Sequence, residues 1–479
     1  MLFSTQVSLA PATASFSLLY LLAVIPSLAV GLPTPNPKHY TPQLDTSTWP
    51  PQDTAYGLII DAGSSGSRIH AYKWLRSSAH QHHIQIEPVL TNKGKPFAHK
   101  IKPGISSLRP EQVPTYMEHL IGNATQVIPK EVLSTTPIYW KATAGMRLLP
   151  QDQSLALTSA VKQSLARSPF QLDPKFGVQI ISGEQEGVYG WLTLNYLRRQ
   201  LSPDSSSFAA LDLGGASTQI TFDPVSTPYA AAYPLHANGT RYLLYTHSYL
   251  RYGADQIRMR YQQSLVSSGN YATQAPGDDQ EVVAIEDPCN WKDSVELVKG
   301  SQGEDVRLIG TGEPLACQKR VHALLQQDTF CTQKPCAVAG AYQPDIPEDM
   351  RIHAVSNYAH VASFFGCDQK EGSTPKCIQD AVQSRCSTLS WKQAYSIWGP
   401  GGTDPKSGGP VAEHLHEMCL GGTYITSLLT QGYHLSLDKP IVFRDDIDGV
   451  DAGWTLGAMI SEADDSTLTS YITNARKSG

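Results

Sequence analysis

Two stretches of small residues, each directly after an aspartate that ends an apolar run, have the residue types of a phosphate site. They are LIIDAGSSGSR at residues 58–68 and AALDLGGASTQ at residues 209–219. Glycine lets the backbone approach a phosphate closely, and successive N–H groups in a tight turn form an anion-binding nest. The first stretch alone is equally typical of a hairpin turn. Its echo about 150 residues later predicts a duplicated fold with one phosphate loop in each half, in which Asp61 and Asp212 hold the water shell of Mg²⁺ or Ca²⁺.

Between the two loops lie ATAGMR (residues 142–147) and SGEQEGVYGW (residues 182–191). Hydrolysis of a phosphoanhydride needs a water nucleophile, a base that orients it, and positive groups near the transferred phosphate. Glu184 and Glu186 are the acidic residues of the second stretch, and glutamate is usually a surface residue. Here the acids follow a strand-like run and lie beside glycines, which favours a catalytic role. Arg147 fits a structural role better than a catalytic one.

The elements that must position these residues alternate between strands and helices, which indicates an α/β protein. Apolar runs and glycine turns predict a strand–turn–strand unit around each loop, and a strand, a turn and a helix over residues 178–197. Helical spacing over residues 152–168 places Leu155 and Val161 on one apolar side. Two further helices are predicted over residues 416–435 and 454–477.

The composition bounds the class of protein. The chain has 479 residues, of which 41% are hydrophobic and 17% charged, which fits two domains or one large one and excludes a disordered or multi-spanning membrane protein. The net charge of −6 and the pI near 6.2 give no sign of a nucleic-acid binder. The basic run at residues 92–104 is more typical of a solvated loop than of a polyanion site.

The first 53 residues have the character of an export signal and a linker. No charged residue precedes Lys38, and the apolar run at residues 18–30 fits the core of a secretory signal, cleaved after Ala29 or Gly31. The usual basic region is missing, so an uncleaved N-terminal anchor stays open. A Pro- and Thr-rich linker follows the signal. Charged residues after Gly457 predict no membrane span at the C-terminal end.

The cysteines indicate an oxidising compartment. All eight lie between Cys289 and Cys419, and an even number without paired CxxC motifs favours disulfides over zinc. Cys331 and Cys336 flank a short loop that suits a local disulfide, whereas spacing alone leaves the other pairings open.

Together these motifs resemble the apyrase regions of the ecto-nucleoside triphosphate diphosphohydrolases. The matching runs are DAGSSGSR, ATAGMRLL, SGEQEGVYGWLTLNY, DLGGASTQITF, and GTYITSLLTQGYHL with DAGWTLGAMI. The resemblance implies an α/β, two-lobed, actin-like ATPase (ribonuclease H-like) fold with the active site in the inter-lobe cleft. The parts implied are a signal peptide at 1–31, a linker at 32–53, lobe I at 54–181, lobe II at 182–448 and a segment at 449–479 that returns to lobe I.

The resemblance also implies a role for each matching residue. The catalytic set is Glu186 as the base, rather than Glu184, with Thr143 and Gln219. Asp61 and Asp212 would hold Mg²⁺ or Ca²⁺ through water. The phosphate-binding set is Ser64, Ser65, Gly66, Arg68, Ala144, Gly214, Gly215, Ala216 and Ser217. The nucleoside-binding set is Asn357, Tyr358 and His414. His414 stands where the family often has an arginine or an aromatic residue, which leaves the base preference open. The disulfides implied are Cys289–Cys317, Cys331–Cys336, Cys367–Cys377 and Cys386–Cys419.

The function implied is metal-dependent hydrolysis of nucleoside triphosphates, diphosphates or both to the monophosphate and phosphate. The expected partners are the nucleotide substrates, with no nucleic acid and no stable membrane span in the mature chain. The expected state is a monomer that is secreted or held in a secretory or periplasmic lumen. Two alternatives are an exopolyphosphatase-like phosphohydrolase and a nucleotide-binding or adhesion protein without turnover.

Overall fold

The computed structural model describes residues 53–76, 85–202, 205–224, 232–268, 271–272, 283–325, 331, 333–404 and 408–463. The predicted signal peptide, almost all of the linker, and the last part of the helix predicted over residues 454–477 lie outside these residues. In the part that is described, no helix is both long enough and apolar enough to cross a membrane.

The first sheet positions the first loop. Its strand order is β3-β2-β1-β5-β6, with β4 paired to β2. The strands are β1 (Thr54–Ala62), β2 (Ser67–Leu75), β3 (Ile86–Pro88), β4 (Ala98–Ile101), β5 (Ile138–Ala142) and β6 (Val178–Ile180). β1 and β2 form an antiparallel hairpin. β1, β5 and β6 run parallel, and parallel neighbours need a crossover connection between them.

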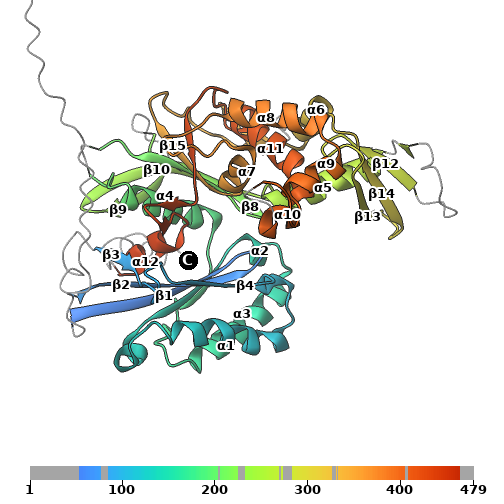
Figure 1. Cartoon of the computed structure of the whole chain (residues 1–479). Coiled ribbons are helices and arrows are strands. Elements are labelled where there is room, and N and C mark those ends of the chain that lie inside the picture. Colours follow the sequence, from blue (N-terminus) through green and yellow to red (C-terminus); the bar gives the residue numbers. More distant parts are fainter. Residues whose placement is uncertain are drawn as a thin grey trace, which may run out of the picture. The chain divides into compact units, whose positions relative to one another are not determined.

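Helices α1 (Val113–Ala124) and α3 (Gln151–Ala166) cover one face of the first sheet (Figure 1). α3 buries Leu157, Val161 and Leu165, which recur at intervals of four residues along one side of the helix. The predicted inward residue Leu155 is instead 61% exposed. The predicted helix is therefore confirmed, but the prediction that Leu155 lies on its buried side is wrong. Leu155 and the buried Leu157 are two residues apart, and two residues turn a helix by more than half a circle, so they lie on opposite sides.

The second sheet repeats the plan of the first and carries the second loop. Its order is β16-β15-β7-β8-β10-β9. The strands are β7 (Phe208–Leu213), β8 (Ser217–Phe222), β9 (Tyr233–Ala237), β10 (Thr240–Leu250), β15 (Arg351–Ser356) and β16 (Ile441–Phe443). β7 and β8 form an antiparallel hairpin, and β7, β15 and β16 run parallel. In the first sheet the hairpin of β1 and β2 is likewise followed by two parallel strands, β5 and β6. The duplication expected from the sequence echo is therefore present in the topology.

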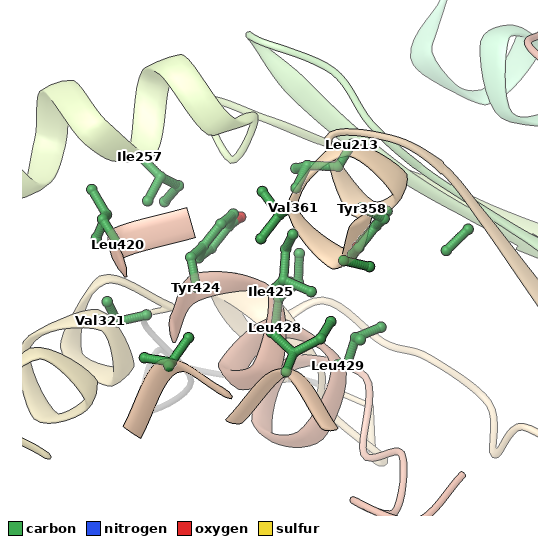
Figure 2. Packing of buried hydrophobic residues seen from close by; sticks show 14 of the residues in the cluster. Leu213, Ile257, Val321, Tyr358, Val361, Leu420, Tyr424, Ile425, Leu428 and Leu429 are labelled. Carbon is green, nitrogen blue, oxygen red and sulfur yellow. The ribbon is translucent and has the colours of Figure 1, made fainter. Parts of the chain in front are cut away.

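A helical layer packs on the second sheet around a large apolar core. It includes α5 (Ala254–Ser268), α6 (Pro314–Leu325), α7 (Asn357–Phe365), α8 (Pro375–Thr388), α9 (Trp391–Trp398), α10 (Gly409–Glu413), α11 (Met418–Ser427) and a π-helical turn at Leu428–Gly432. Figure 2 shows Leu213 of the sheet packed with Val361, Ile425 and other apolar side chains of these helices. A smaller sheet adjoins them, with β11 (Tyr271–Ala272), β12 (Val283–Asp287), β13 (Val295–Lys299) and β14 (Asp305–Gly310).

Four disulfides lie in this second half of the chain, and the structure confirms the pairing implied by the resemblance. They are Cys289–Cys317, Cys331–Cys336, Cys367–Cys377 and Cys386–Cys419.

Helices α4 (Gly183–Leu197) and α12 (Thr455–Ala463) pack against each other. Gly457 of α12 approaches α4 so closely that a Cβ there would lie 2.0 Å from the Tyr189 carbonyl oxygen. The Gly457 N–H donates to Thr193 Oγ1 at 2.7 Å. α12 also reaches the first sheet, where the buried Lys141 ammonium pairs with Glu462 Oε1 at 2.7 Å. α12 therefore contacts both the first sheet and α4, the helix that follows β6 in the chain. A short hairpin of β17 (Asp446–Ile447) and β18 (Val450–Asp451) precedes α12.

Candidate active site

The two glycine-rich loops have the same turn geometry and lie against each other. In the first loop the Gly63 N–H donates to the Gly66 carbonyl at 3.0 Å, and in the second the Gly214 N–H donates to the Ser217 carbonyl at 3.0 Å. A Cβ added to Gly215 would lie 2.6 Å from Ser64 Oγ. The fold therefore brings together loops that are separated by about 150 residues, as the echo predicted.

The predicted phosphate-binding residues lie in or next to this pair of loops. Ser65 is exposed, whereas Gly66 is buried. The side chains of Ala144 and Ala216 are also buried, so only their backbone groups could contact a phosphate. Their roles stay predictions.

Asp61 and Asp212 are the next-to-last residues of β1 and β7, just before the loops. In each, Oδ1 is buried and has no hydrogen-bond partner. Burial raises the pKa of Asp61 to about 7 and the pKa of Asp212 to about 6. Repulsion by Asp212 adds to the shift at Asp61. Two orphaned carboxylate oxygens that raise each other's energy fit a hard cation, which takes oxygen ligands. Within the described residues no three His, Cys, Asp or Glu side chains are grouped so that they could hold a metal directly.

Glu186 lies in the first turn of α4, behind an N-cap at Ser182 whose side chain accepts from the Gln185 N–H. Its carboxylate is 8% exposed and accepts from Arg147 Nη2 at 2.9 Å and from Gln219 Nε2 at 3.2 Å, both at Oε2. Burial raises the pKa of Glu186 to about 8, against the opposing effect of Arg147. A buried carboxyl group with a raised pKa, held by two donors on one oxygen, is a candidate for an acid–base role.

Gln219 contacts this carboxylate, and Thr143 lies at the start of α2 (Ala144–Arg147), the helix that carries Arg147. Thr143 follows β5, is 5% exposed, and its N–H donates to the Ala62 carbonyl at 3.2 Å. Gln219 on β8 is 2% exposed, and its Nε2 also lies 2.7 Å from Ser217 Oγ and 2.9 Å from Ser248 Oγ. The structure thus places Gln219 in contact with both the candidate base and the second loop.

Arg147, which the sequence analysis treats as structural, joins the two halves of the site. It lies in α2 (Ala144–Arg147), and besides Glu186 it contacts Ser217 Oγ at 3.3 Å and the Ile181 carbonyl at 2.9 Å. One guanidinium therefore links the candidate base to the second phosphate loop. The stretch ATAGMR pointed to this segment, but nothing in it identified the contact.

Arg68 turns away from the loops toward the C-terminal hairpin. Its Nη1 donates to Asp451 Oδ2 at 3.0 Å, and both side chains are more than one-third exposed. Beyond it, His360 Nε2 lies 3.0 Å from Asp445 Oδ2, and the hydrogen bond to Asp445 raises the pKa of His360. No sequence motif predicted a role for His360, Asp445 or Asp451. The acidic run RDDIDGVD (residues 444–451) was the only available signal.

The three predicted nucleoside-binding residues have different surroundings. Asn357 Nδ2 donates to the Leu213 carbonyl at 2.8 Å, at the end of β7. Tyr358 is completely buried in the core of the second half, as Figure 2 shows. His414 is 45% exposed and contacts Glu417 Oε2 at 3.3 Å. The structure does not bring these three side chains together, and their roles stay predictions.

The duplicated sheets and facing loops define the two-lobed, actin-like ATPase class of fold, as predicted. A structure of nucleoside triphosphate hydrolases from Neospora caninum has the same fold, with a TM-score of 0.61 and 15% identity over 86% of this chain and 92% of that one. The GDA1/CD39 (nucleoside phosphatase) family profile matches residues 48–475, and the chain belongs to this family.

Two curated relatives are similar over most of their length. Ectonucleoside triphosphate diphosphohydrolase 1 of Rattus norvegicus is 31% identical over 473 residues, covering 92% of this chain and 84% of that protein. Guanosine-diphosphatase of Schizosaccharomyces pombe is 30% identical over 427 residues, covering 85% of this chain and 73% of that protein. These similarities confirm the predicted family and the predicted enzyme class.

Proposed function

We propose that this protein hydrolyses nucleoside tri- and diphosphates to the monophosphate and phosphate, using a divalent cation and a water activated by Glu186. The observation that carries the proposal is the position of Glu186, which is buried and hydrogen-bonded to Arg147 and Gln219 beside the two loops. The names of the two relatives, a triphosphate diphosphohydrolase and a guanosine-diphosphatase, support both substrate classes.

In the proposed reaction the water oxygen bonds to the terminal phosphorus as the bridging P–O bond breaks. Glu186 accepts the proton that the water loses, and Gln219 orients the water. Because both donors bind Oε2, Oε1 is the oxygen available to that proton. Loop N–H groups and Ser64 would stabilise the charge on the phosphate oxygens. The cation held near Asp61 and Asp212, Mg²⁺ or Ca²⁺, would supply further neutralisation of that charge.

Phosphate release from ATP, ADP, GDP, UDP and polyphosphate, with Mg²⁺ or Ca²⁺ and then with chelator, tests this proposal. We expect release from nucleotides that the chelator abolishes. Release from polyphosphate alone would favour the exopolyphosphatase alternative, and nucleotide binding without release would favour the non-catalytic one.

Glu186→Ala is the sharpest single substitution. We expect it to lower kcat by about 10³-fold or more while nucleotide binding persists, because the base acts only on the water. Glu184, two residues earlier in the same helical turn, lies outside the contacts of Arg147 and Gln219 and provides the matched control. An inactive Glu184→Ala with an active Glu186→Ala would contradict the assignment of the base.

We also propose that the protein works outside the cytosol, as a secreted or lumenal monomer. The four disulfides support this proposal, since such bonds persist in oxidising compartments. Fractionation of the producing cells, combined with thiol labelling of the recovered protein, measures both compartment and oxidation state.

A further inference from the structure

A small cavity lies between α4 and the second sheet, directly behind the candidate base. Its volume is about 10 Å³, and its lining includes Glu186, Gly190, Asp212, Gln219 and His353. A space of this size holds about one water molecule, provided that two or more polar groups bind it. The cavity therefore has the size of one water and opens onto three of the candidate catalytic and metal-site residues.

The polar groups are unevenly distributed along the cavity. At one end His353 is already satisfied, because Nε2 contacts the Arg444 carbonyl at 2.7 Å and Nδ1 contacts Arg198 Nη2 at 3.2 Å. At the other end Asp212 Oδ1 is buried without a hydrogen-bond partner. Glu186 and Gln219 lie at this same end, so a water here would find its partners next to the reacting groups.

Gly190 leaves the space open. A Cβ at Gly183 would lie 2.2 Å from the Ser248 side chain, and one at Gly187 would lie 2.5 Å from Thr221 Oγ1. Close packing against the sheet therefore explains these two glycines. A Cβ at Gly190 would meet no atom within 4 Å. Glycine destabilises a helix interior relative to alanine, so packing gives no reason for a glycine at this position.

We propose that this cavity holds the water that replaces the attacking water after each turnover. The inference rests on the proposed function. Each phosphoanhydride bond broken consumes one water, whose oxygen stays on the released phosphate and whose proton passes to Glu186. In-line attack needs that water on the side of the phosphorus away from the leaving group. In the proposed reaction the leaving nucleotide would lie on the opposite side of the phosphorus, whereas the cavity adjoins Glu186 and Gln219.

Gly190→Ala tests the proposal, because the methyl group fits without a clash but takes the place of the water. We expect kcat to fall about tenfold or more with the nucleotide Kd unchanged within about twofold. We also expect the melting temperature to rise by about 1–2 °C, since alanine stabilises the helix. Turnover and stability would then change in opposite directions.

Gly122→Ala in α1 is the matched control, because Gly122 is exposed, is also helical and has no atom within 4 Å of an added Cβ. It should raise the melting temperature similarly and leave kcat unchanged. A crystal structure of the wild-type protein should show a water in the cavity next to Gly190, separate from the attacking water at Glu186 and from the waters of the cation at Asp212. The Gly190→Ala protein should lack it.

Unchanged kcat in Gly190→Ala would overturn the inference, as would loss of nucleotide binding or a wild-type cavity without water. In each of those cases an active wild-type enzyme leaves the proposed function standing. A wild-type protein that releases no phosphate from any nucleotide would overturn both.

Discussion

The hairpin of β1 and β2 and the hairpin of β7 and β8 share one backbone design but use it differently. In both, the strand-ending aspartate faces the residue seven positions later across the hairpin. Asp61 pairs in register with Arg68, and Asp212 with Gln219. Arg68 is partly exposed and bonds outward to Asp451, whereas Gln219 is buried and bonds inward to Glu186. The two hairpins thus share the turn and the aspartate, while the residue that faces the aspartate bonds to the candidate base in one half only.

The shared part of the design predicts the largest effect. Asp61→Asn and Asp212→Asn should each lower kcat/KM by about 10³-fold at saturating cation, because each removes half of the paired carboxylate charge. Steady-state rates across a Mg²⁺ titration, with calorimetry of cation binding in the presence of a nonhydrolysable nucleotide, measure this. If one variant kept full activity, the two halves would not share the metal.

The divergent part predicts unequal effects. Gln219→Ala should lower kcat by about 10²-fold, because it removes a hydrogen bond to the base and to the second loop. Arg68→Ala should change kcat/KM by no more than about fivefold, since its ion pair with Asp451 is exposed. Comparable losses of kcat in the two variants would show that the hairpins are functionally equivalent.

Arg147 contacts both the base and the second loop, and its effect should appear in the pH profile. The guanidinium lowers the pKa of Glu186 against the larger effect of burial. Arg147→Gln should therefore raise that pKa and move the acidic limb of kcat upward by about one pH unit. Activity should recover as the pH rises. Arg147→Lys should shift the limb less, and a purely structural role would leave its position unchanged in both variants.

The smallest expected effect concerns stability without cation. The folded pKa values of Asp61 and Asp212, about 7 and about 6, lie above the unfolded values. The unfolded chain therefore ionises first, and stability falls as the pH rises from about 4 toward the folded pKa values. Melting temperatures of the metal-free protein should drop by a few degrees over this window. Asp61→Asn should remove more of the drop than Asp212→Asn, and the reverse order would contradict the larger pKa shift of Asp61.

Local patterns were sufficient to predict much of the site. The two hairpins and their aspartates follow from short motifs, because each lies within one strand–turn unit. The choice of Glu186 over Glu184 comes instead from the family resemblance, and it stays a prediction. Short motifs do not predict the contacts that their residues make with distant parts of the chain. Arg68 and Asp451 are separated by 383 residues, and Arg147 and Ser217 by 70.

The side of a helix that packs against the core was also not predictable from the sequence. In α7, Tyr358 faces the core, while His360 two residues later is exposed and bonds to Asp445. In α3, the same ambiguity separates the exposed Leu155 from the buried Leu157. A sequence with apolar residues on more than one side of a helix does not reveal which side packs, since tertiary neighbours decide it.

The close crossing of α12 and α4 matters for anyone who shortens or tags this protein. Deleting residues 455–463 would uncover the backbone of the helix that carries Glu186 and leave the buried ammonium of Lys141 without its carboxylate. An unpaired buried charge costs about 3–5 kcal/mol. Truncation libraries should therefore stop after Ala463, and a C-terminal tag should extend the chain rather than replace α12.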